Sequence, residues 1–94
     1  MDNIEKLLDE IREDRQFRDT YFTGGFLNNV ADIFEKYGFG TTEVYLKGRR
    51  ERNEGKQANF LLSLLDKFNK YPEIKNRHSI GRMIIKSLIS LKRR

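Results

Sequence analysis

The sequence predicts an all-α fold, a compact bundle of four long helices and one short helix that form a single domain over residues 1–94. Apolar residues recur at the 3.6-residue spacing of a helix in four separate segments. Only residues 42–46 are rich in β-forming side chains, and no second alternating stretch exists to pair with them. Ninety-four residues are too few for two hydrophobic cores, so we expect one.

The first predicted helix covers residues 2–18 and is amphipathic. Asp2 or Asn3 can cap its start by accepting hydrogen bonds from free backbone N–H groups. Its apolar side chains fall at i, i+3, i+4 and i+7, on one face of the helix: Ile4, Leu7, Leu8 and Ile11. The opposite face is charged, which is typical of a helix with one solvated side.

The second predicted helix covers residues 25–37. We expect it to be the most buried helix, because apolar side chains lie around much of its circumference. Gly38 ends this helix, since glycine tolerates the left-handed conformation found at many helix ends. The short third segment, residues 42–52, begins with residues that suit either a strand or a helix, and its continuation favours a helix. Three side chains are expected to anchor it to the core: Val44, Tyr45 and Leu46.

Two further helices complete the predicted bundle. Residues 56–70 carry apolar side chains at helical spacing and end at a Tyr-Pro pair, because proline lacks a backbone donor. Residues 73–78 are predicted to form a polar connector, either irregular or with one loose turn. The last helix covers residues 79–92, with Ser79 as its cap. Gly81 lowers the stability of this helix by roughly 1 kcal/mol relative to alanine, unless it permits close packing.

The residue types argue against an enzyme, and we predict no catalytic activity, no cofactor and no metal site. Cysteine is absent, which excludes disulfides and cysteine-ligated zinc. The single histidine, His78, lies in the polar connector, where a surface or capping role is expected. Gly38 and Gly40 are only a fragment of a phosphate-binding loop and do not follow a strand. No apolar run approaches the roughly 20 residues of a membrane span, so a cytoplasmic protein is expected.

Charge divides the chain into an acidic and a basic half. Residues 1–46 carry five Lys and Arg against ten Asp and Glu, and residues 47–94 carry fourteen against four. Clustered cations bind phosphate backbones by releasing counterions, so the basic half indicates a nucleic-acid-binding surface. A solvated face that the acidic half neutralises is the structural alternative. The candidate phosphate-binding side chains are Lys47, Arg49, Arg50, Arg52, Lys56, Arg77, Arg82 and Lys86, and the candidates for stacking on a base are Tyr45, Tyr71 and Tyr21.

Residues 31–45 are similar to a helix-turn-helix motif, with a helix, a turn glycine at Gly38 and an apolar residue, Val44, six positions later. Two positions depart from that motif. Phe34 stands where the two helices usually require a small residue, and Lys47 stands where an apolar residue is usual. These departures count against a helix-turn-helix function.

The same stretch resembles the small helical subunit of multisubunit CRISPR effector complexes, particularly those of type III. The residues that carry the resemblance are Gly38-Phe39 at a helix end, then Tyr45, then the basic residues Lys47 and Arg49. A helix such as residues 58–68 and a terminal helix ending in basic residues follow in similar order, so the resemblance covers residues 21–94. It implies a non-catalytic filament subunit that contacts the nucleic-acid backbone and neighbouring copies.

The sequence therefore supports two functions of different classes. The first is a small, non-catalytic, basic helical protein that binds the nucleic-acid backbone as a subunit or accessory factor of a nucleoprotein complex. The alternative is a small protein-binding inhibitor, immunity protein or phage-type adaptor that acts through a helical surface. A protein partner or self-association fits either function. A membrane surface is not expected as a partner, because the broad apolar face of the last helix is expected to close the bundle.

Overall fold

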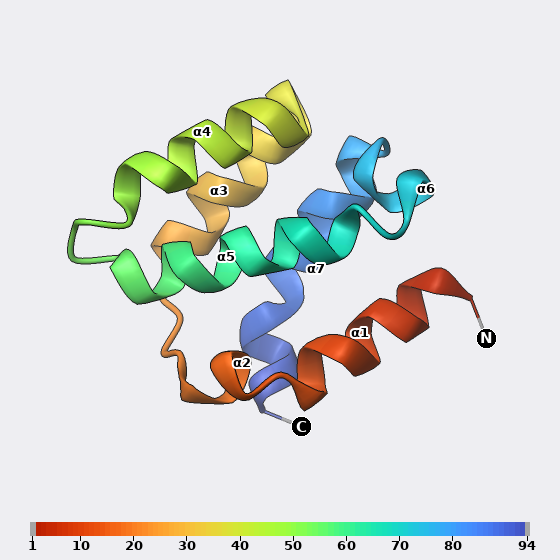
Figure 1. The fold of residues 1–94 in the computed structure, drawn as a ribbon, viewed down its shortest axis with the longest axis horizontal. Coiled ribbons are helices and arrows are strands. Elements are labelled where there is room, and N and C mark those ends of the chain that lie inside the picture. Colours follow the sequence, from red (N-terminus) through yellow and green to blue (C-terminus); the bar gives the residue numbers. More distant parts are fainter. Residues whose placement is uncertain (1, 94) are drawn as a thin grey trace.

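The computed structural model describes residues 2–93, and every regular element within them is an α-helix (Figure 1). The helices are α1 (Asn3–Glu13), α2 (Arg15–Asp19), α3 (Gly24–Tyr37), α4 (Phe39–Arg49), α5 (Gly55–Phe68), α6 (Pro72–Lys75) and α7 (His78–Lys92). This confirms the all-α prediction. The predicted four long helices and one short helix are corrected, because five helices have 11 residues or more and two others, α2 and α6, are short.

The helices surround one core. In Figure 1, α5 lies across the middle of the view, with α4 above it, α1 and α2 below it, and α7 running behind it. The largest fully buried side chains are three aromatic residues, Phe34, Phe60 and Phe68, contributed by α3 and α5. The core therefore lies between the central helix α5 and the helices that cover it.

The predicted helix over residues 2–18 is divided at Asp14 into α1 and α2. Asp14 has an extended backbone (φ −75°, ψ 120°), and its carboxylate accepts a hydrogen bond from the N–H of Gln16 at 2.8 Å. A continuous helix would extend the apolar stripe of α1 to charged positions such as Arg18. The break instead turns Phe17 into the core, where it is 4% exposed.

The packing of α3 against α7 depends on Gly81. A Cβ atom at this position would lie 2.1 Å from Cε1 of Phe34. Phe34 is fully buried and makes an edge-to-face contact with Phe68, with ring centroids 5.6 Å apart. The absence of a side chain at Gly81 thus allows α3 and α7 to pack this closely.

Helices α3 and α4 are joined by Gly38 alone, whose φ of 88° lies in the left-handed region. The predicted helix end at Gly38 is confirmed, and this connection is shorter than the turn of about three or four residues in a helix-turn-helix. Residues 42–46 are helical, but α4 begins at Phe39 and not at Thr42. Thr42 is buried within α4, where its hydroxyl donates to the Gly38 carbonyl at 2.7 Å.

The predicted anchors of α4 differ in burial. Leu46 is fully buried and Tyr45 is half-buried, whereas Val44 is 70% exposed, so the prediction for Val44 is wrong. Thr42 and Leu46 lie four residues apart and share the core-facing side of the helix. Val44 lies two residues from each of them and therefore points to the opposite side.

The predicted polar connector over residues 73–78 also contains a helix. α6 begins at Pro72, where the missing N–H is tolerated because the first N–H groups of a helix have no intrahelical partner. Ile74 is fully buried and anchors α6 to the core. A single apolar residue in a polar stretch has no periodic partner, so the sequence allows one loose turn here but does not identify a helix that begins at Pro72.

His78 begins α7, one residue before the predicted cap Ser79. Its Nδ1 atom lies 3.0 Å from the backbone carbonyl of Glu35, one of the last carbonyls of α3, and donates a hydrogen bond to it. Its ring also makes an edge-to-face contact with Phe34. The histidine therefore links the start of α7 to the end of α3, which agrees with the expected capping role.

Candidate nucleic-acid interface

A cluster of cations lies where α4 turns into α5, at one end of the molecule (Figure 1). This loop cluster consists of Lys47, Arg49, Arg50, Arg52 and Lys56. The turn is tight, since the N–H of Arg52 donates to the Arg49 carbonyl at 3.1 Å and the N–H of Gly55 donates to the Arg52 carbonyl at 2.9 Å. A Cβ atom at Gly55 would lie 2.5 Å from the Arg50 carbonyl oxygen, so glycine allows α5 to begin this close to the end of α4.

The positive charge of the loop cluster is not neutralised by ion pairs within residues 2–93. None of its five side chains forms an ion pair with a carboxylate of residues 2–93. Four of them are exposed, and Arg49 is half-buried. Over residues 47–56 these five cations stand against only two carboxylates, Glu51 and Glu54. An excess of positive charge is therefore concentrated on a surface that a ligand can reach.

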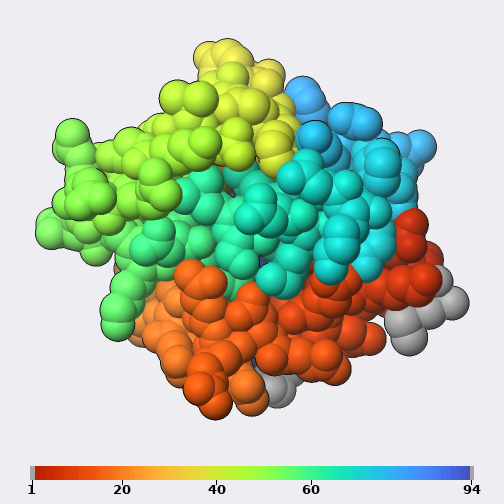
Figure 2. All heavy atoms as spheres, in the orientation of Figure 1, coloured from red at the N-terminus to blue at the C-terminus, as the bar shows by residue number. Residues whose placement is uncertain are grey.

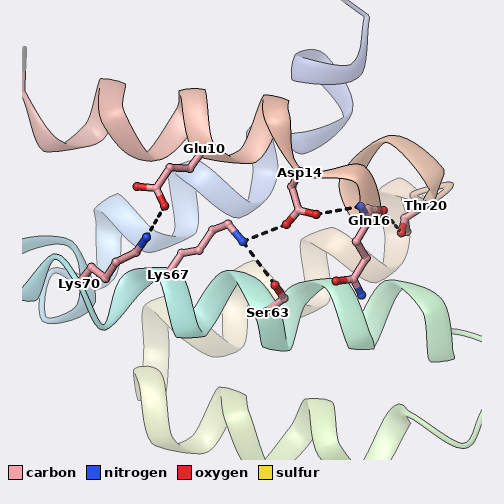
Figure 3. A network of polar contacts seen from close by, with 7 residues as sticks. All are labelled: Glu10, Asp14, Gln16, Thr20, Ser63, Lys67 and Lys70. Carbon is pink, nitrogen blue, oxygen red and sulfur yellow. Dashed lines mark hydrogen bonds and ion pairs between the residues drawn. The ribbon is translucent and has the colours of Figure 1, made fainter.

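Cations at the other end of α5 are paired with the acidic first half of the chain. Nζ of Lys67 lies 2.9 Å from the carboxylate of Asp14, and Lys70 pairs with Glu10 (Figure 3). Hydrogen bonds from Lys70 and Tyr71 lower the pKa of Glu10. Burial acts to raise the pKa of Asp14, but hydrogen bonds from Lys67 and a backbone N–H outweigh it and lower this pKa. The acidic half thus neutralises this end of α5 and not the loop cluster.

Tyr45 contacts the cluster through Arg49. Nε of Arg49 donates to the Tyr45 hydroxyl at 3.3 Å, and the guanidinium carbon lies 5.4 Å from the centroid of the tyrosine ring. This hydrogen bond raises the pKa of Arg49. The Tyr45 ring also stacks on Phe26, with centroids 6.5 Å apart. Tyr45 is therefore placed to hold Arg49 in position.

The remaining predicted cations lie elsewhere. Arg77 precedes α7 beside α6, at the opposite end of the molecule from the loop cluster (Figure 1). Nε of Arg82 lies 3.4 Å from Glu35 and 3.9 Å from Asp32, both on α3. Lys86 is exposed on α7, which runs behind α5 in this view. The eight predicted cations therefore do not form one continuous surface.

Arg15 adds a cation that the sequence does not predict for this surface. Helices α2 and α5 border an open hollow of about 360 Å³ beside the loop cluster. Its lining comprises Arg15, Gln16, Asp19, Thr20, Lys56 and Asn59. Lys56 belongs to the loop cluster, and Arg15 lies on α2, on the other side of the hollow. Figure 2 shows the green start of α5 beside the orange α2 segment. Arg15 lies in the acidic half of the sequence, so only the fold brings it here.

Comparison with known proteins found no matching family model, no matching curated protein and no matching solved structure. Within residues 2–93, no group of three or more His, Cys, Asp and Glu side chains is arranged to hold a metal ion. None of the described helices combines the length and apolar character that crossing a membrane requires.

Proposed function

We propose that this protein binds the phosphate backbone of nucleic acids through the loop cluster, as a non-catalytic subunit or accessory factor of a nucleoprotein complex. The observation that carries the proposal is that these five cations have no ion-pair partner among residues 2–93, whereas Lys67, Lys70 and Arg82 do. Cations that are free before binding can neutralise phosphates and release counterions, which is the main source of non-specific affinity for nucleic acids.

The side chains of the cluster suit phosphate. Three of the five are arginines, whose planar guanidinium groups can donate two parallel hydrogen bonds to one phosphate. The contacts of Tyr45 restrict the freedom of Arg49, so less conformational entropy is lost when this arginine binds a ligand. Tyr45 therefore acts as a positioning residue in this proposal and not as a stacking platform.

A purely structural role does not account for the whole cluster. Lys47 and Arg49 lie in the last turn of α4, where cations stabilise the negative end of a helix. Arg52 lies beyond α4, where this effect fades. Lys56 lies in the first turn of α5, where a cation meets the positive end of the helix and is mildly destabilising. A ligand of negative charge explains why these cations gather at both helix ends.

The test is the salt dependence of binding to mixed-sequence DNA and RNA, measured by fluorescence anisotropy. We expect log K to fall linearly with log salt concentration. Reversing charge in the triple variant Arg49→Glu, Arg50→Glu and Arg52→Glu should weaken binding to all sequences and reduce the slope by roughly two to three. The matched control is Lys36→Glu, Arg77→Glu and Lys86→Glu, which makes the same change in net charge at exposed positions outside the loop cluster.

Two outcomes would overturn the proposal. One is the absence of any binding at low salt with micromolar protein. The other is an equal loss of affinity in the loop variant and the matched control, since this would assign binding to net charge alone. Retained affinity in the control with a large loss in the loop variant is the expected result.

The alternative function, a small protein-binding inhibitor, immunity protein or phage-type adaptor, gives different results in the same assays. The observation that favours it is the exposure of two apolar side chains, Val44 at 70% and Met83 at 52%. It predicts a stoichiometric protein complex on a sizing column that persists at moderate salt, with no affinity of the wild-type protein for nucleic acid. Self-association would be visible on the same column without any partner.

A further inference from the structure

Tyr21 projects from the connector between α2 and α3. Its side chain is 83% exposed, whereas the neighbouring Thr20 and Phe22 are 3% and 5% exposed. Thr20 has an extended backbone (φ −99°, ψ 130°), in which successive side chains point to opposite sides. Burial of the two neighbours therefore forces the tyrosine outward.

The backbone that carries Tyr21 is held on both sides. The hydroxyl of Thr20 donates to a carbonyl of α2 at 2.6 Å, and the N–H of Thr23 donates to the side chain of Gln57 at 3.0 Å. The ring of Phe22 makes an edge-to-face contact with Phe60 in the core, with centroids 5.4 Å apart. An aromatic ring on a fixed backbone gives contact area at little cost in conformational entropy.

Two cations share a hollow with this ring. Tyr21 lines an open hollow of about 340 Å³, in which Ile89 supplies an apolar wall and Lys92 and Arg93 supply positive charge. No carboxylate of the described residues lines this hollow. Nζ of Lys92 donates to the backbone carbonyl of Arg18 at 2.9 Å, so its position is fixed. This hollow therefore combines an exposed aromatic ring with an apolar wall and two cations.

We infer that Tyr21 is a stacking platform for an unpaired base, with Lys92 and Arg93 contacting the adjacent phosphates, and that the ligand of this protein is therefore single-stranded nucleic acid. This inference rests on the proposed function. Every base has a π face that stacks on an aromatic side chain, but a base within a duplex has both faces covered by its neighbours. Only an unpaired base can use the ring of Tyr21.

The same strand can reach the loop cluster. Thr20, which directly precedes Tyr21, lines the hollow between α2 and α5 that also contains Arg15 and Lys56. Lys56 belongs to the loop cluster, so two cations, Lys56 and Arg15, line this hollow together with one carboxylate, Asp19. The stacking site therefore adds a base contact to a surface that otherwise binds phosphate.

A tryptophan at position 21 tests the stacking directly, because the chain contains no other tryptophan. Stacking on a base quenches indole fluorescence. We expect a single-stranded oligonucleotide to quench the Tyr21→Trp variant, and a duplex of the same sequence to leave it unchanged. The control is Tyr37→Trp, which places the indole at another exposed tyrosine, 57% exposed at the end of α3. Its fluorescence should not respond to either ligand.

Affinities of alanine and phenylalanine variants give a second measurement. Loss of one stacked base typically weakens binding by roughly 5- to 150-fold, so Tyr21→Ala should lose this much affinity for the single strand. Tyr21→Phe should keep the wild-type affinity, because its ring still stacks. Tyr37→Ala should also behave as wild type. All five substitutions, including the two to tryptophan, are at exposed side chains and are expected to leave the fold intact.

The outcomes separate this inference from the proposed function. Equal affinity for single strands and duplexes, with no effect of Tyr21→Ala, would overturn the inference and leave the loop cluster as the binding surface. Equal losses in Tyr21→Ala and Tyr21→Phe would assign the effect to the hydroxyl and also overturn it. If the wild-type protein binds neither form, the proposed function is wrong and the inference is wrong with it.

Discussion

Replacing Gly81 with alanine should destabilise the protein, although the same change stabilises most helices. Alanine inside a helix is ordinarily favoured over glycine by roughly 1 kcal/mol. At Gly81, however, the added Cβ atom would lie 2.1, 2.6 and 2.7 Å from three atoms of the Phe34 ring. Carbon atoms are in favourable contact at about 3.5–4.0 Å, so the ring or the helix must move.

The ring of Phe34 has little room to move. It is fully buried and held edge-to-face against Phe68. Overpacking a core typically costs about 1–3 kcal/mol, and so severe an overlap belongs at the upper end of this range. After subtraction of the gain in helix propensity, we expect Gly81→Ala to lower the free energy of unfolding by about 2 kcal/mol. For a domain of this size such a loss lowers Tm by roughly 8–16 °C.

Urea denaturation followed by circular dichroism measures the effect. Gly48→Ala in α4 is the matched control. Apart from the neighbouring backbone of α4, no described atom lies within 4 Å of the added Cβ, so this variant should be more stable than the wild type by up to about 1 kcal/mol. Combining Gly81→Ala with Phe34→Leu should cost less than the sum of the two changes, since the smaller side chain relieves the overlap. A Gly81→Ala protein as stable as the wild type would refute the packing explanation for this glycine.

Three further predictions concern acid sensitivity and helix boundaries. The pKa values of Glu10 and Asp14 are lowered in the folded protein, so these carboxylates stabilise the fold at pH values above their ordinary pKa values of 4.5 and 3.8. This contribution is lost as the pH falls below those values. The urea concentration at the midpoint of unfolding should therefore decrease once the pH is below about 4.5. Asp14→Asn keeps a capping side chain but removes the ion pair with α5, and it should lower the free energy of unfolding by about 1 kcal/mol at neutral pH, with a smaller difference from wild type in acid. Gly38→Ala should destabilise by more than about 1 kcal/mol in thermal unfolding, because φ is 88° and the added Cβ would lie 2.7 Å from Nε2 of His78.

The parts of the fold that follow from local periodicity are predictable from the sequence. The predicted helices over residues 25–37 and 56–70 correspond to α3 (Gly24–Tyr37) and α5 (Gly55–Phe68), within two residues at each end. Their apolar side chains recur at 3.6-residue spacing, and glycine or proline lies near their ends. The loop cluster is predictable for a similar reason, because its cations are neighbours in the sequence.

The remaining features depend on residues that are distant in the sequence. The break at Asp14 places its carboxylate beside Lys67, which is 53 residues away. Arg82 is paired with α3, and this contact exists only because α3 packs against α7. Arg15 reaches the candidate interface only after the break turns α2 toward α5. Local patterns carry no information on such contacts, so neither the paired cations nor the added one can be recognised before folding.

The placement of the cations in the fold changes the expected strength of binding. The basic half of the sequence has fourteen Lys and Arg, and this number alone suggests a steep dependence on salt. The loop cluster offers only five unpaired cations, which limits the slope for duplex DNA to roughly −4.5, or about −0.9 for each phosphate contact. A single strand that also contacts Arg15, Lys92 and Arg93 would give a slope near −5.6, at about −0.7 for each contact. Parallel titrations of both ligands should therefore show the steeper slope for the single strand, and a steeper slope for the duplex would contradict the path past Tyr21.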